Sequence, residues 1–177
     1  TYDDFDGNSI DPLRWGISDP SGIASVSGGF LHVDSPPNLD PNPWLHLTLP
    51  QQLYGDFGIM LSFQNFSYDS PPIQLGDSPS ISLQASWYDS DTRYEAFVVR
   101  VVRSNGDVFF SNYAPSSSDG EEASTTSTEG KLFLLRRGST YQMGYDDGTQ
   151  TVILQTFEGG WTGEVSLDLM SSTGFDG

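Results

Sequence analysis

Oxygen-bearing side chains stand at alternate positions near the start of the chain, in the stretch DDFDGNSID. Calcium prefers carboxylate and amide oxygens at such spacing, which makes Asp4, Asp6, Asn8 and Asp11 candidate ligands. The glycine comes too early for an EF-hand loop, and no bidentate glutamate follows. Aspartate and asparagine also bond their own backbone in turns, and we take turn formation as the first interpretation.

A second pair of carboxylates, Asp89 and Asp91 in YDSDTRYE, is another incomplete calcium pattern. Calcium is therefore an optional ligand here, and no cofactor is required. Zinc is less well supported, because the chain has no cysteine and only two histidines, His32 and His46. Each histidine stands in an alternating strand-like run, which favours a half-buried structural role.

Paired carboxylates that could hydrolyse a glycosidic bond are the next chemistry to consider. Glu164 and Asp168 share one face of a predicted strand, but four residues of strand separate them by about 13 Å. Glycosidase carboxyl groups lie about 5.5 Å apart in retaining enzymes and at most about 9.5 Å apart in inverting enzymes. We therefore predict no enzyme activity, although a pair from different strands stays open.

Aromatic and arginine side chains offer a route to glycan binding, because sugars stack on aromatic faces while polar groups bind their hydroxyls. The competing interpretation is burial, since strand aromatics are usually core residues. Trp161, in the turn EGGWTG, and Trp87 are the preferred positions. The full set of candidate glycan-binding residues is Trp44, Trp87, Tyr88, Tyr113, Trp161, Arg100 and Arg103.

The net charge of −17, with a single lysine at Lys131, limits the partners of the protein. Such a field repels nucleic acid and anionic membranes and favours cations or neutral polymers. No apolar run approaches membrane-spanning length. Together these features predict an extracellular or cell-surface protein that neither binds nucleic acid nor inserts into a membrane. Asn65-Phe66-Ser67 is a glycosylation sequon, a motif that often occurs by chance.

The elements that position these residues are predicted to be strands, because short alternating runs are separated by glycine, proline, asparagine, aspartate and serine. No stretch has a helical period. Asn105-Gly106, Arg137-Gly138 and Asp147-Gly148 predict hairpin turns. The expected strands are Ile23–Val26, Gly29–Val33, Trp44–Leu49, Phe57–Phe66, Ser80–Tyr88, Tyr94–Arg103, Asp107–Tyr113, Lys131–Arg137, Thr140–Tyr145, Thr151–Phe157 and Gly163–Met170.

Eleven short strands without helices predict a single domain over residues 1–177, an all-β antiparallel two-sheet jelly-roll sandwich. Two segments interrupt the strand pattern. Residues 35–43, SPPNLDPNP, form a proline-rich loop, and residues 112–130 form a long polar loop of low complexity.

The runs DDFDGNSIDPLRW, VSGGFLHV, LYGDFGIMLSF and GKLFLLRRGSTYQMGYDDG resemble the concanavalin A-like lectin/glucanase superfamily, in particular lectin-like jelly-roll domains of bacterial surface proteins. The resemblance covers nearly the whole chain. It implies that Phe5 and Trp15 pack into the sandwich beside an edge strand. Glucanase members carry an E-x-D-x-E or E-x-D-x-x-E strand, and this motif does not occur here.

The tripeptide FDG occurs near both ends of the chain, and related domains continue with a closing strand that the sequence lacks. We therefore predict that another copy, or another repeat, completes the sheet edge after Met170 by β-augmentation. The residues of this predicted assembly edge are Tyr2, Asp4, Phe5 and Phe175.

The predicted function is accordingly a non-catalytic structural or adhesive building block of a homo-oligomer, filament or tandem-repeat surface fibre. A free-standing carbohydrate-binding module is the alternative, and a glycoside hydrolase is the third.

Overall fold

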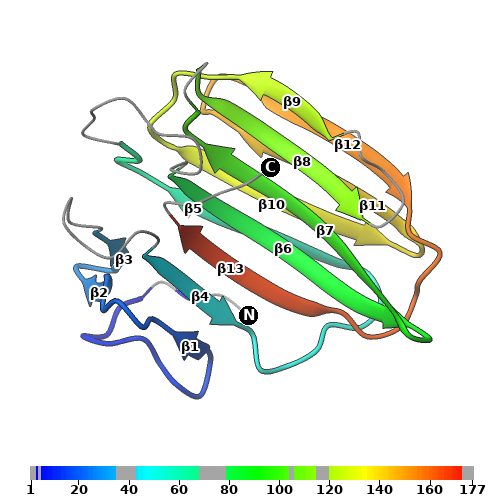
Figure 1. Cartoon of the computed structure of the whole chain (residues 1–177), viewed down its shortest axis with the longest axis horizontal. Coiled ribbons are helices and arrows are strands. Elements are labelled where there is room, and N and C mark those ends of the chain that lie inside the picture. Colours follow the sequence, from blue (N-terminus) through cyan, green and yellow to red (C-terminus); the bar gives the residue numbers. More distant parts are fainter. Residues whose placement is uncertain are drawn as a thin grey trace.

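The computed structural model describes residues 3, 5–34, 43–67, 79–103, 106–114 and 120–172. Over these residues the chain forms thirteen strands and no helix, arranged as two large antiparallel sheets and one small hairpin (Figure 1). The predicted all-β antiparallel sandwich is confirmed. In the described part of the chain, no helix is long and apolar enough to cross a membrane.

The front sheet in Figure 1 has seven strands in the order β1-β4-β13-β6-β7-β8-β9. Strand β13 lies between β4 and β6, which brings the end of the described chain beside strands of its first half. The bounds of its strands are β1 Gly16–Ser18, β4 Trp44–Thr48, β13 Ser166–Ser172, β6 Ser80–Asp89, β7 Thr92–Val101, β8 Val108–Ala114 and β9 Glu121–Ser124.

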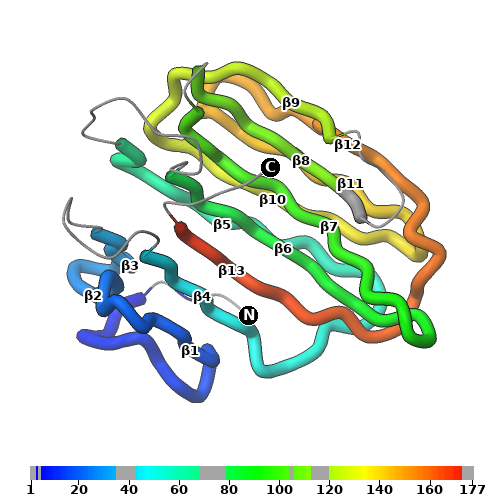
Figure 2. Tube along the Cα trace, viewed as in Figure 1, coloured from blue at the N-terminus to red at the C-terminus, as the bar shows by residue number. Residues whose placement is uncertain are grey.

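A four-stranded sheet in the order β12-β11-β10-β5 packs behind it, and β2 pairs with β3 at one end. The tube view shows β2 and β3 beside β4, away from the long strands (Figure 2). The remaining bounds are β5 Phe57–Phe63, β10 Gly130–Arg137, β11 Thr140–Asp146, β12 Thr151–Glu158, β2 Ala24–Ser27 and β3 Phe30–Val33.

Alternation of side chains along each strand builds the core between the two sheets, because successive residues point to opposite faces. In β6, Leu83, Ala85 and Trp87 point inward and are buried. Aromatic rings stack across the layers: Phe109 lies on Tyr145 with centroids 3.9 Å apart. A fully buried apolar side chain of this kind contributes about 1.5–3 kcal/mol through burial alone.

All eleven predicted strands are present, with ends shifted by a few residues. Two short edge strands, β1 and β9, were not predicted. The second forms inside the segment expected to be a polar loop, because its backbone completes the open edge of β8. Gly138 and Gly148 take positive φ angles of 59° and 84°, as the predicted hairpin turns require. Apart from Pro43, the predicted proline-rich loop lies outside the described residues.

Candidate functional site

The outer face of the seven-stranded sheet carries polar side chains on neighbouring strands. Residues that pair directly across antiparallel strands point to the same face, so their register identifies this surface. Ser82 on β6 pairs with Met170 on β13, and Gln84 pairs with both Asp168 on β13 and Phe97 on β7. We call this surface the polar track; its residues are Ser80, Ser82, Gln84, Glu95, Phe97, Asp168, Met170 and Ser172.

The polar track is hollowed rather than flat. Seven of its eight residues, all except Asp168, line a cavity of about 100 Å³. Ser80 and Ser82 are buried although they point away from the core. The Ser80 hydroxyl makes a local contact, a 3.2 Å bond between its Oγ atom and that of Ser172. Buried hydroxyls cost free energy unless they are paired, so a row of them is an informative feature of this face.

Two charged groups border the track. The buried carboxylate of Asp168 lies 2.8 Å from Nε2 of His46 on β4, which also contacts the Thr48 hydroxyl at 3.3 Å. Glu95 forms a 2.8 Å ion pair with Arg93, further along β7. His46 therefore has a structural partner in the sheet, consistent with the half-buried position expected from its alternating run.

The carboxylates of Asp168 and Glu95 lean away from each other. Their Cα atoms lie two strands apart across the sheet and two residues apart along it, a separation of about 12 Å. Asp168 reaches toward β4, whereas Glu95 reaches toward Arg93. Each carboxylate is therefore bonded to a basic side chain, Asp168 to His46 and Glu95 to Arg93.

A larger cavity of about 500 Å³ adjoins the track where β6 turns into β7. Its volume falls within the usual range for small-molecule sites. We call it the rim pocket; it is lined by Gln52, Tyr54, Ser86, Trp87, Tyr88, Trp161, Gly163, Glu164 and Ser166. From Ser80 to Tyr88 the combined surface runs about 27 Å along β6.

Backbone contacts hold the rim pocket together. An isolated bridge joins Leu53 and Val165 through hydrogen bonds of 2.8 and 3.0 Å, and it places their neighbours Tyr54 and Glu164 side by side. The Tyr54 hydroxyl donates to the Glu164 carboxylate, and this bond raises the pKa of Tyr54. The sequence pattern did not identify Tyr54, because the bridge that brings it to Glu164 is a long-range contact.

The turn that carries Glu164 is fixed from two sides. The Trp161 indole N–H donates to the Glu164 carbonyl at 3.0 Å, and buried Arg136 donates to the Gly163 carbonyl at 2.8 Å. Arg136 also lies over the rings of Phe57 and Tyr141. This part of the pocket wall is therefore anchored to the sandwich core.

The predicted glycan-binding aromatics divide between surface and core. Trp44 is 38% exposed and borders the track beside Ser172, while Tyr88 is 61% exposed in the rim pocket. Trp161 lines the same pocket. Trp87 is buried and stacks on Tyr94 and Tyr141, so only part of its ring lines the pocket. The side chain of Tyr113 lies outside the described residues.

The two predicted arginines are engaged in the fold. Arg100 is buried, binds Asp107 at 2.7 Å and donates to the carbonyl oxygens of Val101 and Ser127. Arg103 pairs with Glu122 at 2.8 Å and lies over the Phe110 ring. Neither arginine lines the track cavity or the rim pocket.

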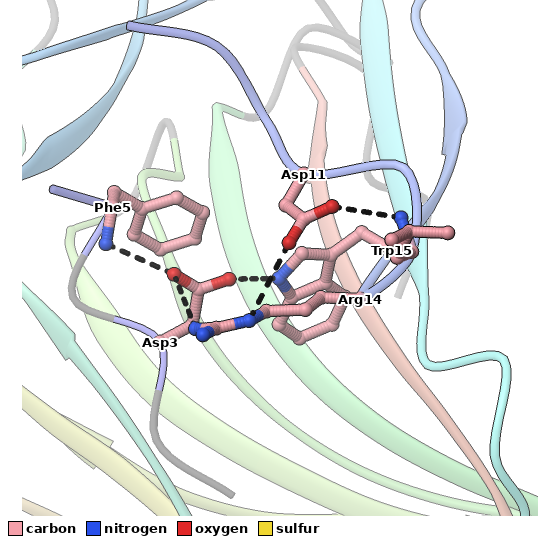
Figure 3. A network of polar contacts seen from close by, with 6 residues as sticks. Asp3, Phe5, Asp11, Arg14 and Trp15 are labelled. Atoms are coloured by element: carbon pink, nitrogen blue, oxygen red, sulfur yellow. Dashed lines mark hydrogen bonds and ion pairs between the residues drawn. The ribbon is translucent and has the colours of Figure 1, made fainter. Parts of the chain in front are cut away.

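The opening aspartates that the structure describes make turn and anchoring contacts (Figure 3). The Trp15 indole donates to Asp3 at 2.6 Å, and the Phe5 amide donates to the same carboxylate at 3.0 Å. Asp11 accepts from the Leu13 amide at 2.9 Å, which caps the turn.

The structure does not bring the candidate calcium ligands together in the residues it describes. Asp6 and Asn8 are exposed, Asp4 lies outside the described residues, and Asp89 and Asp91 flank the exposed turn between β6 and β7. In the described segments, no three histidine, aspartate or glutamate side chains form a group that could hold a metal.

Strand β13 does not present the open edge predicted after Met170. It lies between β4 and β6, and both of its edges are paired within the chain (Figure 2). Of the predicted assembly residues, Tyr2, Asp4 and Phe175 lie outside the described residues. Phe5 is described, with a positive φ of 49° and its amide bonded to Asp3.

Comparisons with known proteins support the fold and revise the predicted function. No protein-family model and no curated protein sequence matches the chain. Solved structures do match: LamAcat from Zobellia galactanivorans has a TM-score of 0.62 at 10% identity, over 97% of this chain and 86% of that one. A legume lectin-like domain from Entamoeba histolytica gives 0.63 at 8% identity, over 95% and 87%.

A glycoside hydrolase family 16 endo-glucanase from Bacteroides ovatus, solved with G4G3G-2F-DNP, gives a TM-score of 0.58 at 12% identity, over 97% and 85% of the two chains. The resemblance to the concanavalin A-like superfamily is therefore confirmed at the level of the fold. This fold serves both glucanases and a lectin-like domain, so it does not by itself decide between catalysis and binding.

The prediction of a structural or adhesive building block of a surface fibre is wrong. The matching structures are mainly glucanases together with a lectin-like domain, and none of their descriptions gives a fibre role. Within the chain, the paired edges of β13 remove the open edge on which that prediction rested. The sequence argument had inferred an open edge from a closing strand that the sequence lacks, whereas the last described strand is paired on both sides.

Proposed function

We propose that this protein binds a carbohydrate chain along the polar track and does not hydrolyse it. The observation that carries the proposal is the continuous surface formed by the track and the rim pocket. Hydroxyls, an amide and carboxylates supply hydrogen-bonding groups along its floor. Exposed aromatic rings stand at both ends, Trp44 at one and Tyr88 at the other. Aromatic faces with a few oriented polar groups are typical of ligand sites.

Non-hydrolytic binding is favoured by the partners of the carboxylates. Asp168 is engaged by His46, and Glu95 by Arg93. The chain also lacks the E-x-D-x-E strand of glucanases. An extracellular location fits a polysaccharide ligand and the acidic surface, and it remains part of the proposal. Calcium is not needed for this mode of binding.

Binding is tested by isothermal titration with soluble glucan oligosaccharides, using wild-type protein and the double variant Trp44→Ala/Gln84→Ala. We expect at least a tenfold weaker Kd for the double variant, because it removes one stacking surface and one amide from the track. The matched control is Met60→Ala/Ile153→Ala, which removes two exposed side chains from the outer face of the other sheet. Equal affinity of all three proteins would contradict the proposal.

Hydrolysis is the second candidate, favoured by the structural likeness to family 16 glucanases. The same oligosaccharides are incubated with the protein, and new reducing ends are measured over time. Cleavage that Glu95→Gln or Asp168→Asn abolishes would replace the binding proposal with a hydrolase. Binding without new reducing ends supports the proposal as stated.

A further inference from the structure

We propose that the rim pocket is a site for an organic ammonium group. The inference rests on the proposed function in one respect: the expected carrier of the ammonium group is an amino sugar within the bound chain. A quaternary ammonium compound has the same chemistry, and the experiment separates the two sources.

Aromatic rings form much of the rim pocket. Tyr54, Trp87, Tyr88 and Trp161 all line it, and the two tyrosines are 65% and 61% exposed. Trp87 is buried and stacks on two neighbours, with ring centroids 5.8 Å from Tyr94 and 5.0 Å from Tyr141, so the ring faces offered to a ligand come from the other three residues. Ring faces attract cations through their quadrupole, most strongly where water is displaced. Several rings around one cavity therefore suit an ammonium group better than an anion.

Among the described residues, Glu164 is the only charged one that lines the pocket. The Tyr54 hydroxyl donates a hydrogen bond to its carboxylate. The bridge between Leu53 and Val165, on the neighbouring residues, fixes both groups in place. An ionised carboxylate next to aromatic faces combines a charge partner with cation–π contacts.

Among the six arginines and one lysine of the chain, Arg93 lies directly across from the pocket residue Tyr88 on the same face of the sheet, and its charge is paired with Glu95. None of the seven lines the pocket, and Arg136, the one bonded to the pocket wall, is buried and binds the Gly163 carbonyl. The whole chain carries a net charge of −17, which attracts cations over longer range. At about 500 Å³ the cavity suits an organic group rather than a bare metal ion.

The probes are a glucosamine hexamer, its fully N-acetylated counterpart and tetramethylammonium chloride, each titrated calorimetrically at pH 5.5 into the complete chain. At this pH the amines of the first probe are protonated, and acetylation removes that charge. We expect the glucosamine hexamer to bind at least tenfold more tightly than the acetylated hexamer. Glu164→Gln should abolish most of this difference between the two hexamers.

The matched control is Glu129→Gln. It makes the same charge change at an exposed residue outside the pocket, directly before the first residue of β10. Tyr54→Phe should weaken ammonium binding less than Glu164→Gln does, since the carboxylate remains. Thermal melting confirms that each variant is folded.

The outcomes separate this inference from the proposed function. Neutral oligosaccharides that bind with no preference for the amine, and with no effect of Glu164→Gln, would overturn the inference while the proposed function stands. Tetramethylammonium binding that Glu164→Gln abolishes, with no oligosaccharide bound, would support the pocket and overturn the proposed function. No binding of any probe would overturn both.

Discussion

The two outer faces of the sandwich use opposite chemistry on the same kind of backbone. On the seven-stranded sheet, outward residues include the buried serines Ser80 and Ser82 and the buried carboxylate of Asp168. On the four-stranded sheet, Met60 and Ile153 point outward with 60% and 51% exposure. Single exposed apolar residues are ordinary on protein surfaces, whereas buried polar groups need a reason. The contrast is one reason to propose the seven-stranded face as the binding face.

On the outer face of the four-stranded sheet, a buried phenylalanine packs over a glycine. Phe133 on β10 pairs with Gly144 on β11, and its ring covers the space where a side chain at that position would stand. Dense packing on this face thus comes from apolar fit, whereas the other face combines an apolar cluster of Val99, Val101 and Val108 with the polar groups of the track.

The largest effect on stability is expected from Gly144→Ala. A Cβ atom at this position would overlap the carbonyl oxygen of Val152 and come within 2.6 Å of the Phe133 ring. Backbone cannot yield easily, so we expect a loss of about 3 kcal/mol in the free energy of unfolding, the upper end for overpacking. Chemical denaturation measures it.

Gly58→Ala is the control for this substitution. It lies on the same face, and its Cβ would meet only a flexible Leu135 methyl group at 3.0 Å. We expect its stability to change by less than about 0.5 kcal/mol. Equal effects of the two substitutions would show that this face is not held by close packing at Gly144.

A smaller effect is expected from Asp168→Ala on the other face. The substitution leaves His46 and a partly enclosed polar surface without their carboxylate partner, at a cost of about 1–3 kcal/mol. Met60→Ala is the matched change at an outward position of the four-stranded sheet and should cost less than about 0.5 kcal/mol. If denaturation shows no difference between them, the buried polar groups of the track do not stabilise the fold.

The fold was predictable from local pattern, because alternation and turn residues specify strands one at a time. All eleven predicted strands formed, while β1 and β9 were missed because short edge strands depend on the neighbour they pair with. The run SISLQASWY of β6 alternates polar with apolar residues, a pattern that could have predicted the polar outward face of the track. Glu164 and Tyr54 come together only through the bridge at Leu53 and Val165, a contact that sequence spacing does not reveal.

The smallest effect concerns a turn on the four-stranded sheet. Asp147 accepts hydrogen bonds from the Thr149 hydroxyl and from the amides of Thr149 and Gln150, and these bonds lower its pKa, the Thr149 side chain having the largest influence. A carboxylate with a lowered pKa stabilises the fold above its unfolded pKa, and this contribution is lost as pH falls through the folded value.

Asp147→Asn should therefore lower the Tm slightly at pH 7, and the difference from wild type should shrink as the pH falls below about 4. Part of the decrease in Tm at low pH would then come from this turn rather than from the track. Thermal melting between pH 2.5 and 7 measures the effect, with Asp91→Asn, in the turn between β6 and β7, as the control. A difference that stays constant over this pH range would mean that the charge of Asp147 does not contribute to the acid sensitivity, and no difference at any pH would mean that asparagine preserves what the turn needs.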